Sequence, residues 1–331
     1  MIGRFAPSPT GELHLGNLRT ALASWLSARA QGGRWLIRME DVDKARCRGT
    51  LGEAQLRDLA ALGLESDGPV LWQSRRHGAY QDALQALFQA GSLYPCVCTR
   101  KDLASLGSAP HGEDGLRPYP GTCRRRPLPF LRPDALRFRL PEGPVTWTDR
   151  VLGPRSDDPA SLTGDPLLHR RDGCYAYHLA VVADDGAQGV TEVVRGLDLR
   201  AVTATQIRLQ EALGLARPAY AHLGLVTSPG GARLGKRDGA LGLALLAHRG
   251  IAIPEILGWL GWSLGCLDRP EPVSAAELVG RFHWERVDPG PVAVPREWPG
   301  RLGFASGDLS VPADFDQMGS GEIERGFRGE G

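Results

Sequence analysis

A run of chemically versatile residues lies near the amino terminus, where positions 4–17 are R-F-A-P-S-P-T-G-E-L-H-L-G-N. The pattern predicts a short strand at residues 2–6, a turn rich in proline, and a helix that begins at Leu15. Such a strand-to-helix corner favours phosphate, because the backbone N–H groups of the helix N-terminus point toward it. His14 can donate to a phosphate, and Gly16 leaves the helix surface bare for a nucleotide. In isolation, a histidine beside a glycine is more often a capping or packing residue.

Other polar residues follow apolar segments further along the chain. Glu40 and Asp41 come directly after a strand predicted at residues 35–39. Such a pair is often a solvated strand end, but the carboxyl edge of a buried strand favours a functional role for Glu40. Tyr177 and Arg195 flank a second apolar stretch, and an arginine fork suits a planar carboxylate. Taken alone, Tyr177 is better explained as an ordinary aromatic residue at the edge of the core.

Three cysteines form a candidate metal site, Cys96-x-Cys98 and Cys123. In a reducing cytosol, cysteines are more often thiols or metal ligands than disulfides. Three thiolates suit zinc, and a fourth ligand would complete a tetrahedron. Chemistry alone leaves that fourth ligand open, with His111 as the natural competitor. We assign the remaining cysteines to buried unpaired thiols: Cys47, Cys174 and Cys266.

A basic loop of sequence A-R-L-G-K-R-D occupies residues 232–238, directly after a predicted strand. By itself, this loop is explained equally well by a solvated basic turn.

Taken together, these residues closely resemble the class I aminoacyl-tRNA synthetases of the glutamyl group. Residues 4–17 resemble the first signature of that family, and G-G-R-W-L-I-R-M-E-D-V-D at 32–43 matches the same group. Residues 175–196 resemble the start of the second half of the fold, and residues 232–238 resemble the second signature. The resemblance covers roughly residues 1–290.

The resemblance implies activation of glutamate by ATP, which requires positioning and positive charge at the α-phosphate rather than a covalent nucleophile. It implies that His14 and Lys236 act in catalysis. The implied glutamate-binding residues are Arg4, Phe5, Ala6, Pro7, Ser8, Glu40, Tyr177 and Arg195. The implied ATP-binding residues are His14, Gly16, Asn17, Arg233 and Lys236, with Mg²⁺ accompanying ATP. Arg233 and Gly235 replace the lysine and serine usual in the second signature, so we expect a looser loop and slower activation.

For the metal site, the resemblance implies Tyr119 as the fourth ligand, in the order C-x-C…Y-x₃-C. We therefore expect one structural Zn²⁺ per chain, held by Cys96, Cys98, Tyr119 and Cys123 and clamping an inserted loop that touches RNA. The basic run at 124–126 is a candidate phosphate contact.

The resemblance to the synthetase core ends near residue 290, and about forty residues without periodicity remain. A usual anticodon-binding region is therefore not expected. This truncation, the cysteine pattern and the block A-Y-H-L-A-V-V-A-D-D resemble the synthetases that glutamylate queuosine at the first anticodon position of tRNA(Asp). The implied partners are ATP, L-glutamate and tRNA(Asp) carrying queuosine. A minimal tRNA(Glu) ligase, a zinc-stabilised RNA-binding protein that has lost catalysis, and another nucleotidyltransferase of the H-x-G-H superfamily remain alternatives.

Strands and helices must position these residues, and their order along the chain predicts an α/β fold. The resemblance implies the class I synthetase type of this fold, a Rossmann-like parallel sheet with an inserted zinc module and a helical segment. The pattern predicts helices at 50–63, 77–91 and 199–213, strands at 136–140, 178–183, 193–194 and 223–226, and mostly helix over 239–282. We expect these parts: 1–92 and 176–245 as the two halves of the catalytic domain, 93–175 as the inserted module, 246–294 as the helical segment and 295–331 as a disordered tail.

The composition is that of a globular protein, with 42% hydrophobic and 23% charged residues in a chain of 331. A net charge of +1 excludes a histone-like binder that relies on bulk positive charge. We see no signal peptide and no apolar run long enough for a membrane span, and expect a cytoplasmic monomer.

Overall fold

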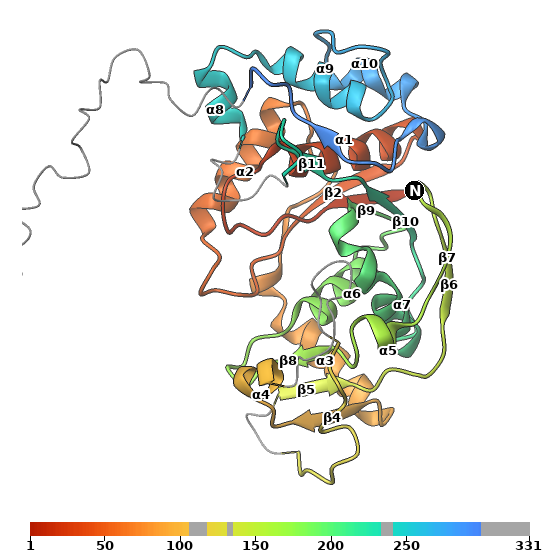
Figure 1. Cartoon of the computed structure of the whole chain (residues 1–331). Coiled ribbons are helices and arrows are strands. Elements are labelled where there is room, and N and C mark those ends of the chain that lie inside the picture. The colour runs from red at the N-terminus through yellow and green to blue at the C-terminus, as the bar shows by residue number, and fades with distance from the viewer. Residues whose placement is uncertain (106–117, 131–134, 233–240, 299–331) are drawn as a thin grey trace, which may run out of the picture. The chain divides into compact units, whose positions relative to one another are not determined.

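A seven-stranded sheet forms the centre of the protein in the computed structural model, which describes residues 1–105, 118–130, 135–232 and 241–298 (Figure 1). Its strands are, in spatial order, β3 (Leu71–Trp72), β2 (Arg34–Met39), β1 (Ile2–Phe5), β9 (Glu192–Gly196), β10 (Ala219–Leu223), β6 (Val145–Asp149) and β7 (Gly153–Asp157). The pairs from β3 to β6 are parallel, and β7 is antiparallel to β6. The α/β fold with a mainly parallel sheet is thus confirmed.

Two smaller sheets accompany the large one. Strands β4 (Leu93–Cys96), β5 (Ala135–Phe138) and β8 (Leu167–His169) form an antiparallel sheet, and β11 (Val226–Thr227) pairs with β12 (Val292–Ala293). The range 93–175 therefore contributes β4, β5 and β8 to a sheet of its own, while its strands β6 and β7 join the large sheet.

Helices surround these sheets within the unit formed by residues 1–293. They are α1 (Leu15–Ala30), α2 (Gly49–Ala61), α3 (His77–Gln89), α4 (Arg100–Ser105), α5 (Pro159–Leu162), α6 (Tyr177–Ala187), α7 (Thr203–Ala212), α8 (Leu243–His248), α9 (Ile253–Ser263) and α10 (Ala275–Leu278). Short 3₁₀ turns are η1 (Gln73–Arg75), η2 (Leu197–Val202), η3 (Val279–Arg281) and η4 (Trp284–Arg286). None of the helices in the described ranges combines the length and apolarity needed to cross a membrane.

Helix α1 is buried on most sides, because β1, β2 and β9 cover one side and α9 and α10 cover another (Figure 1). Its buried residues include Arg19, whose guanidinium donates to Ser263 of α9 and to the carbonyl of Gly224. The helix ends before Gly32, whose φ of +60° is one that glycine adopts without strain.

The prediction of a strand at residues 178–183 is wrong, because these residues lie in helix α6. Leu179 to Val182 are all buried in a core that includes Tyr80 of α3 and Leu209 of α7. A continuous apolar run of this length is compatible with either a buried strand or a helix enclosed on all sides, and periodicity does not separate them.

Most other elements expected from the sequence are present. The helices at 50–63 and 77–91 correspond to α2 and α3, and 199–213 contains η2 followed by α7. The strand expected at 223–226 is interrupted, since β10 ends at Leu223 and β11 begins at Val226. Between them, the carbonyl oxygen of Gly290 approaches Gly224 so closely that no side chain would fit there. The region 241–282 consists of the three helices α8, α9 and α10, the 3₁₀ turn η3, and loops. Residues 239–240 and 299–331 lie outside the described ranges.

The strand order reverses between β1 and β9, which are neighbours in the sheet although far apart in sequence. At such a switch point the connections leave in opposite directions and open a crevice beyond the carboxyl ends of the two strands. The residues that follow β1 and end β9 therefore meet there.

Candidate active site

A cavity of about 460 Å³ lies at this switch point. It is large enough for a small organic ligand. The residues expected to bind glutamate or ATP that line it are Arg4, Phe5, Ala6, Pro7, Ser8, His14, Gly16, Asn17, Glu40, Tyr177 and Arg195. Arg233, Gly235 and Lys236 lie outside the described residues, as does His111.

The corner between β1 and α1 is closed by a capping box. The Nδ1 atom of His14 accepts hydrogen bonds from the backbone N–H groups of Gly16 at 3.1 Å and Asn17 at 3.3 Å. The side-chain oxygen of Asn17 accepts from the backbone N–H of His14 at 3.2 Å. Because Nδ1 is an acceptor, the neutral imidazole carries its proton on Nε2. Capping and phosphate binding are therefore compatible, since they use different ring nitrogens.

Gly16 leaves little room for a side chain beside this cap. A Cβ atom built at Gly16 would lie 3.0 Å from Cε1 and 3.1 Å from Nδ1 of His14. To accommodate a side chain there, the imidazole ring of His14 would have to shift by a few tenths of an ångström.

The loop after β1 is held by neighbouring side chains and backbone. Gln55 of α2 donates to the carbonyl oxygens of Ser8 at 3.2 Å and Gly11 at 2.7 Å. The backbone N–H of Glu40 donates to the carbonyl of Pro7 at 2.9 Å. The loop is thus fixed beside Glu40, which directly follows β2.

Buried ion pairs hold two of the expected glutamate ligands. Arg4 donates through Nε to Asp185 of α6 at 3.2 Å and through a terminal nitrogen to the carbonyl of Val194 at 3.2 Å. Arg38 donates to the same oxygen of Asp185 at 2.7 Å, and its other terminal nitrogen lies 3.7 Å from Glu40. Asp185 therefore orients Arg4 directly and Glu40 through Arg38.

Burial raises the pKa of Glu40 to about 7, and the nearby charges of Arg38 and Arg4 offset only part of that effect. Asp185 differs, because the same two guanidinium groups outweigh its burial and lower its pKa. At neutral pH the site therefore contains one firmly ionised carboxylate and one that is close to its midpoint.

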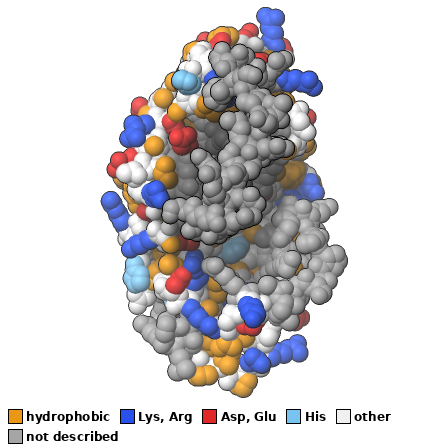
Figure 2. Space-filling model, turned by 60° about the vertical axis from the view of Figure 1, so that its left-hand side comes forward, with side chains coloured by type: hydrophobic (Ala, Val, Ile, Leu, Met, Phe, Trp, Pro, Cys, Tyr) orange, Lys and Arg blue, Asp and Glu red, His pale blue; other side chains and the backbone are white. Residues whose placement is uncertain are grey.

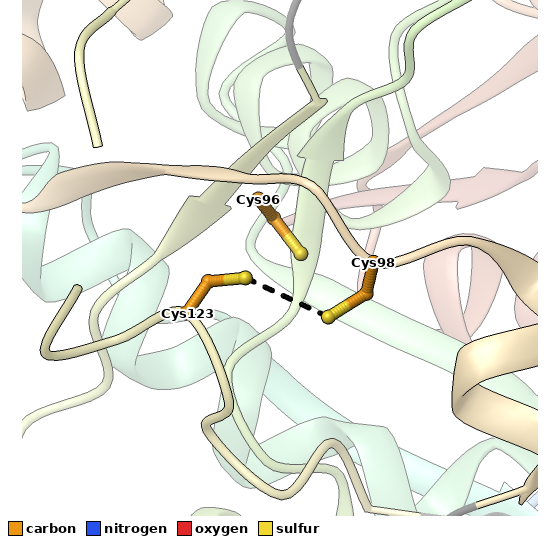
Figure 3. Close-up of side chains that lie close together, drawn as sticks. All are labelled: Cys96, Cys98 and Cys123. Atoms are coloured by element: carbon orange, nitrogen blue, oxygen red, sulfur yellow. Dashed lines mark hydrogen bonds between the residues drawn. The ribbon is translucent and has the colours of Figure 1, made fainter.

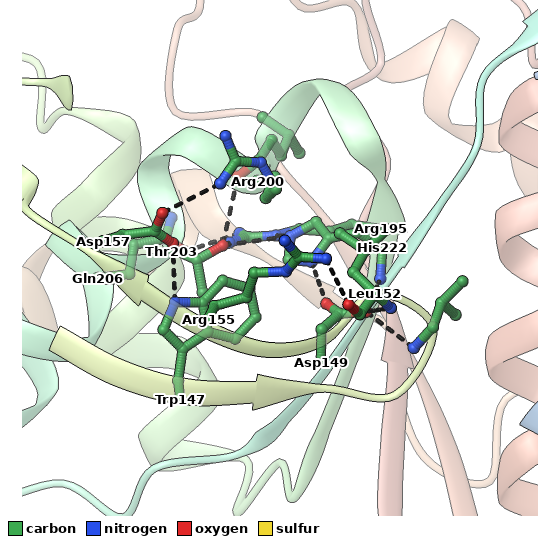
Figure 4. Close-up of polar contacts among 12 residues, drawn as sticks. Trp147, Asp149, Leu152, Arg155, Asp157, Arg195, Arg200, Thr203, Gln206 and His222 are labelled. Atoms are coloured by element: carbon green, nitrogen blue, oxygen red, sulfur yellow. Dashed lines mark hydrogen bonds and ion pairs between the residues drawn. The ribbon is translucent and has the colours of Figure 1, made fainter. Parts of the chain in front are cut away.

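Tyr177 and Arg195 also line the cavity. Tyr177 begins α6, lines the cavity and is 38% exposed. Arg195 is buried in β9 and donates to His222, Gln206 and Thr203. Figure 4 shows Arg195 within a wider group of polar contacts that reaches β6, β7 and η2.

The cysteines form a compact group near β4, as Figure 3 shows. The sulfur atoms of Cys96, Cys98 and Cys123 lie within 4.8 Å of one another, with Cys98 and Cys123 3.6 Å apart. The hydroxyl of Tyr119 lies 3.5 Å from the sulfur of Cys96 and 3.7 Å from that of Cys98. These four side chains could hold a metal ion.

On the face drawn in Figure 2, basic side chains are interspersed with acidic and apolar ones, in keeping with the small net charge.

The sequence analysis did not identify Asp185, which holds Arg4, or His222 and Asp149, which together hold Arg195. The only signal for Asp185 was an acidic pair directly after the apolar run of α6.

Comparisons with known proteins agree with this geometry. The chain matches the family model described as tRNA synthetases class I (E and Q), catalytic domain, over residues 1–263. It is 47% identical over 299 residues to the Glutamyl-Q tRNA(Asp) synthetase of Geobacter sulfurreducens, covering 89% of this chain and 94% of the relative. It is 44% identical over 319 residues to the protein of the same name from Symbiobacterium thermophilum, covering 90% and 97%. The fold is similar to a crystal structure of a glutamate tRNA ligase from Elizabethkingia meningosepticum in complex with its amino acid, with a TM-score of 0.78 and 26% identity over 90% of this chain and 68% of that one.

Proposed function

Because the chain belongs to the class I tRNA synthetases for glutamate and glutamine, we propose that it activates L-glutamate with ATP and transfers it to the queuosine base at the first anticodon position of tRNA(Asp). The observation that carries this proposal is the identity of 44–47%, over about nine-tenths of the chain, to relatives named Glutamyl-Q tRNA(Asp) synthetase. The identity to the glutamate tRNA ligase of known structure is 26%.

The cavity suits glutamate because it offers complementary charge at both ends of that molecule. Arg195 provides a guanidinium for the side-chain carboxylate, with Tyr177 beside it, and Glu40 provides a carboxylate for the ammonium group. Arg4 and Ser8, with the backbone of Phe5, Ala6 and Pro7, border the remaining space.

Activation is an in-line displacement at phosphorus. A carboxylate oxygen of glutamate attacks the α-phosphorus of ATP, the bond to the bridging oxygen breaks, and pyrophosphate leaves. His14 donates from Nε2 to the phosphate oxygens, and Gly16 and Asn17 border the nucleotide at the N-terminus of α1. Lys236 and Arg233 supply positive charge to the pyrophosphate, and ATP enters with Mg²⁺. A hydroxyl of queuosine then attacks the carbonyl carbon of the adenylate, loses its proton and displaces AMP.

The cysteine group fits zinc. A tetrahedral Zn²⁺ with sulfur ligands at about 2.3 Å places those sulfurs about 3.8 Å apart, and an oxygen ligand lies about 3.6 Å from each sulfur. The 3.6 Å between Cys98 and Cys123, and the 3.5 and 3.7 Å from Tyr119 to Cys96 and Cys98, are close to these values. We propose that these four side chains hold one structural ion, which cross-links the segment after β4 to the loop at 119–123.

We also propose a division of the chain into parts. Residues 1–92 and 176–245 form the two halves of the catalytic domain, 93–175 contains the acceptor module, and 246–294 is an accessory helical segment. An enzyme that uses ATP and tRNA is proposed to act in the cytoplasm, and a site built from one chain is compatible with a monomer.

Two assays test the proposed function. Pyrophosphate exchange into ATP should require glutamate and proceed without RNA. Labelled glutamate should then attach to tRNA(Asp) that contains queuosine and not to the same tRNA without it, and nuclease mapping should place the label in the anticodon loop. No exchange by folded protein would refute activation. Label at the 3′ end of tRNA(Glu) would instead identify a minimal tRNA(Glu) ligase.

A further inference from the structure

Arg195 is held by residues from two neighbouring strands of the parallel sheet. It lies near the carboxyl end of β9, His222 lies at the matching position of β10, and Asp149 ends β6. Because Arg195 and His222 are register partners, their side chains lie on the same face of the sheet. All three are at most 4% exposed. Figure 4 shows them in one line of contacts.

The hydrogen bonds of this line have a defined direction. Arg195 donates from Nε to Nε2 of His222 at 3.0 Å, so Nε2 must be the acceptor and the proton of His222 must be on Nδ1. That Nδ1 lies 2.6 Å from Oδ2 of Asp149, which accepts a hydrogen bond from it. Burial lowers the pKa of His222 to about 4 despite the hydrogen bond to Asp149, so the ring is neutral at neutral pH.

Asp149 is itself fixed by backbone groups. Its Oδ1 accepts from the N–H groups of Val151 and Leu152, both at 2.9 Å, and from that of His222 at 3.3 Å. These bonds leave Oδ2 for the imidazole. The hydrogen bond from His222, together with the backbone bonds from Leu152 and Val151, outweighs the effect of burial and lowers the pKa of Asp149.

The terminal nitrogens of Arg195 are held in the same way. One donates to Oε1 of Gln206 and the other to the hydroxyl of Thr203, each at 2.7 Å. A guanidinium has five N–H groups. Among the described residues three have partners, which leaves one N–H on each terminal nitrogen for a ligand in the cavity that Arg195 lines.

We propose that Asp149 and His222 are positioning residues for substrate recognition: the carboxylate selects the His222 tautomer that accepts from Arg195, and thereby aims its two remaining N–H groups at the side-chain carboxylate of glutamate. This inference rests on the proposed function, because it takes glutamate as the ligand of Arg195. Neither residue touches the substrate in this arrangement. Their contribution is to glutamate affinity and selection rather than to the attack at phosphorus.

The decisive variant is Asp149→Asn, which is nearly isosteric. The three backbone N–H groups retain an oxygen at the Oδ1 position, so the new NH₂ group faces Nδ1 of His222. The imidazole must then accept at Nδ1 and carry its proton on Nε2, where it opposes the N–H of Arg195. His222→Leu removes the acceptor altogether, whereas His222→Gln places an amide oxygen near the position of Nε2 and restores it.

The experiment measures glutamate-dependent pyrophosphate exchange by the full chain at varied glutamate and varied ATP. We expect Asp149→Asn and His222→Leu to raise KM for glutamate about ten- to hundredfold, the range for a buried donor left without its partner, and to change kcat and KM for ATP less than about threefold. We expect His222→Gln to stay within about threefold of wild type, and Asp149→Asn to add little in that background.

The matched control is Glu192→Gln. This residue is a buried carboxylate at the opposite end of β9, bonded to Ser27 and Arg150, and its loss should leave KM for glutamate unchanged. The proposal is overturned if both Asp149→Asn and His222→Leu retain a KM for glutamate within twofold of wild type. It is also overturned if KM for ATP rises equally, or if Glu192→Gln has the same effect. If Asp149→Asn does not fold, the comparison of His222→Gln with His222→Leu decides by the same criteria. A wild-type protein without exchange overturns the proposed function, whereas an active wild type with unaffected variants overturns only this inference.

Discussion

We predict that Glu40 makes glutamate binding depend on pH near neutrality. Its pKa of about 7 means that about 10% of the side chains are ionised at pH 6 and about 90% at pH 8. The ammonium group of glutamate stays charged over this range, and only the ionised carboxylate attracts it. The apparent KM for glutamate should therefore fall about tenfold between pH 6 and pH 8, because the raised pKa leaves Glu40 neutral on the acid side.

Pyrophosphate exchange at several pH values measures this KM directly. Glu40→Gln is the control, because an amide does not titrate: its KM should be high and should lose most of the pH dependence. Calorimetry adds an independent reading, since binding at pH 7 should release about half a proton per glutamate. A KM that changes less than twofold between pH 6 and pH 8, or the same slope in Glu40→Gln, would refute the role given to this carboxylate.

Four further changes test other parts of the site. Cys123→Ser should lower the bound zinc from about one ion per chain and reduce Tm, as measured by elemental analysis and thermal unfolding; full zinc content would contradict the assigned ligands. Gly16→Ala should lower kcat about tenfold or more, because the new Cβ displaces the His14 ring, and an unchanged exchange rate would show that the ring position is unimportant. Asp185→Asn should reduce the free energy of unfolding in urea by about 3–5 kcal/mol, because two buried guanidinium groups lose their shared partner; a loss under 1 kcal/mol would contradict this. Lys236→Ala should greatly slow adenylate formation and leave glutamate binding nearly intact, and equal loss of both would show that its role is misassigned.

Residues that act together and also lie together in sequence were the most predictable. The corner from Arg4 to Gly16 spans one strand end, one loop and one helix start, so turn residues and apolar spacing suffice to place it. The cysteine group was predictable for a related reason, because Cys96 and Cys98 are two residues apart and the chemistry of thiolates is specific. The helix at 177–187 was mistaken for a strand, because its central residues are buried and leave no polar face.

The amino-acid sequence by itself determined the kinds of chemistry present: a histidine and a glycine at a helix start, a carboxylate after an apolar strand, and arginines suited to a carboxylate ligand. Only the tertiary structure decided how those groups are aimed. Arg4 depends on Asp185, 181 positions away, and His222 depends on Asp149, 73 positions away. Such pairs have no local signal in the sequence, because the two residues meet only when the strands are arranged in the sheet. The charges are then buried, and a buried charge without a partner is costly in free energy.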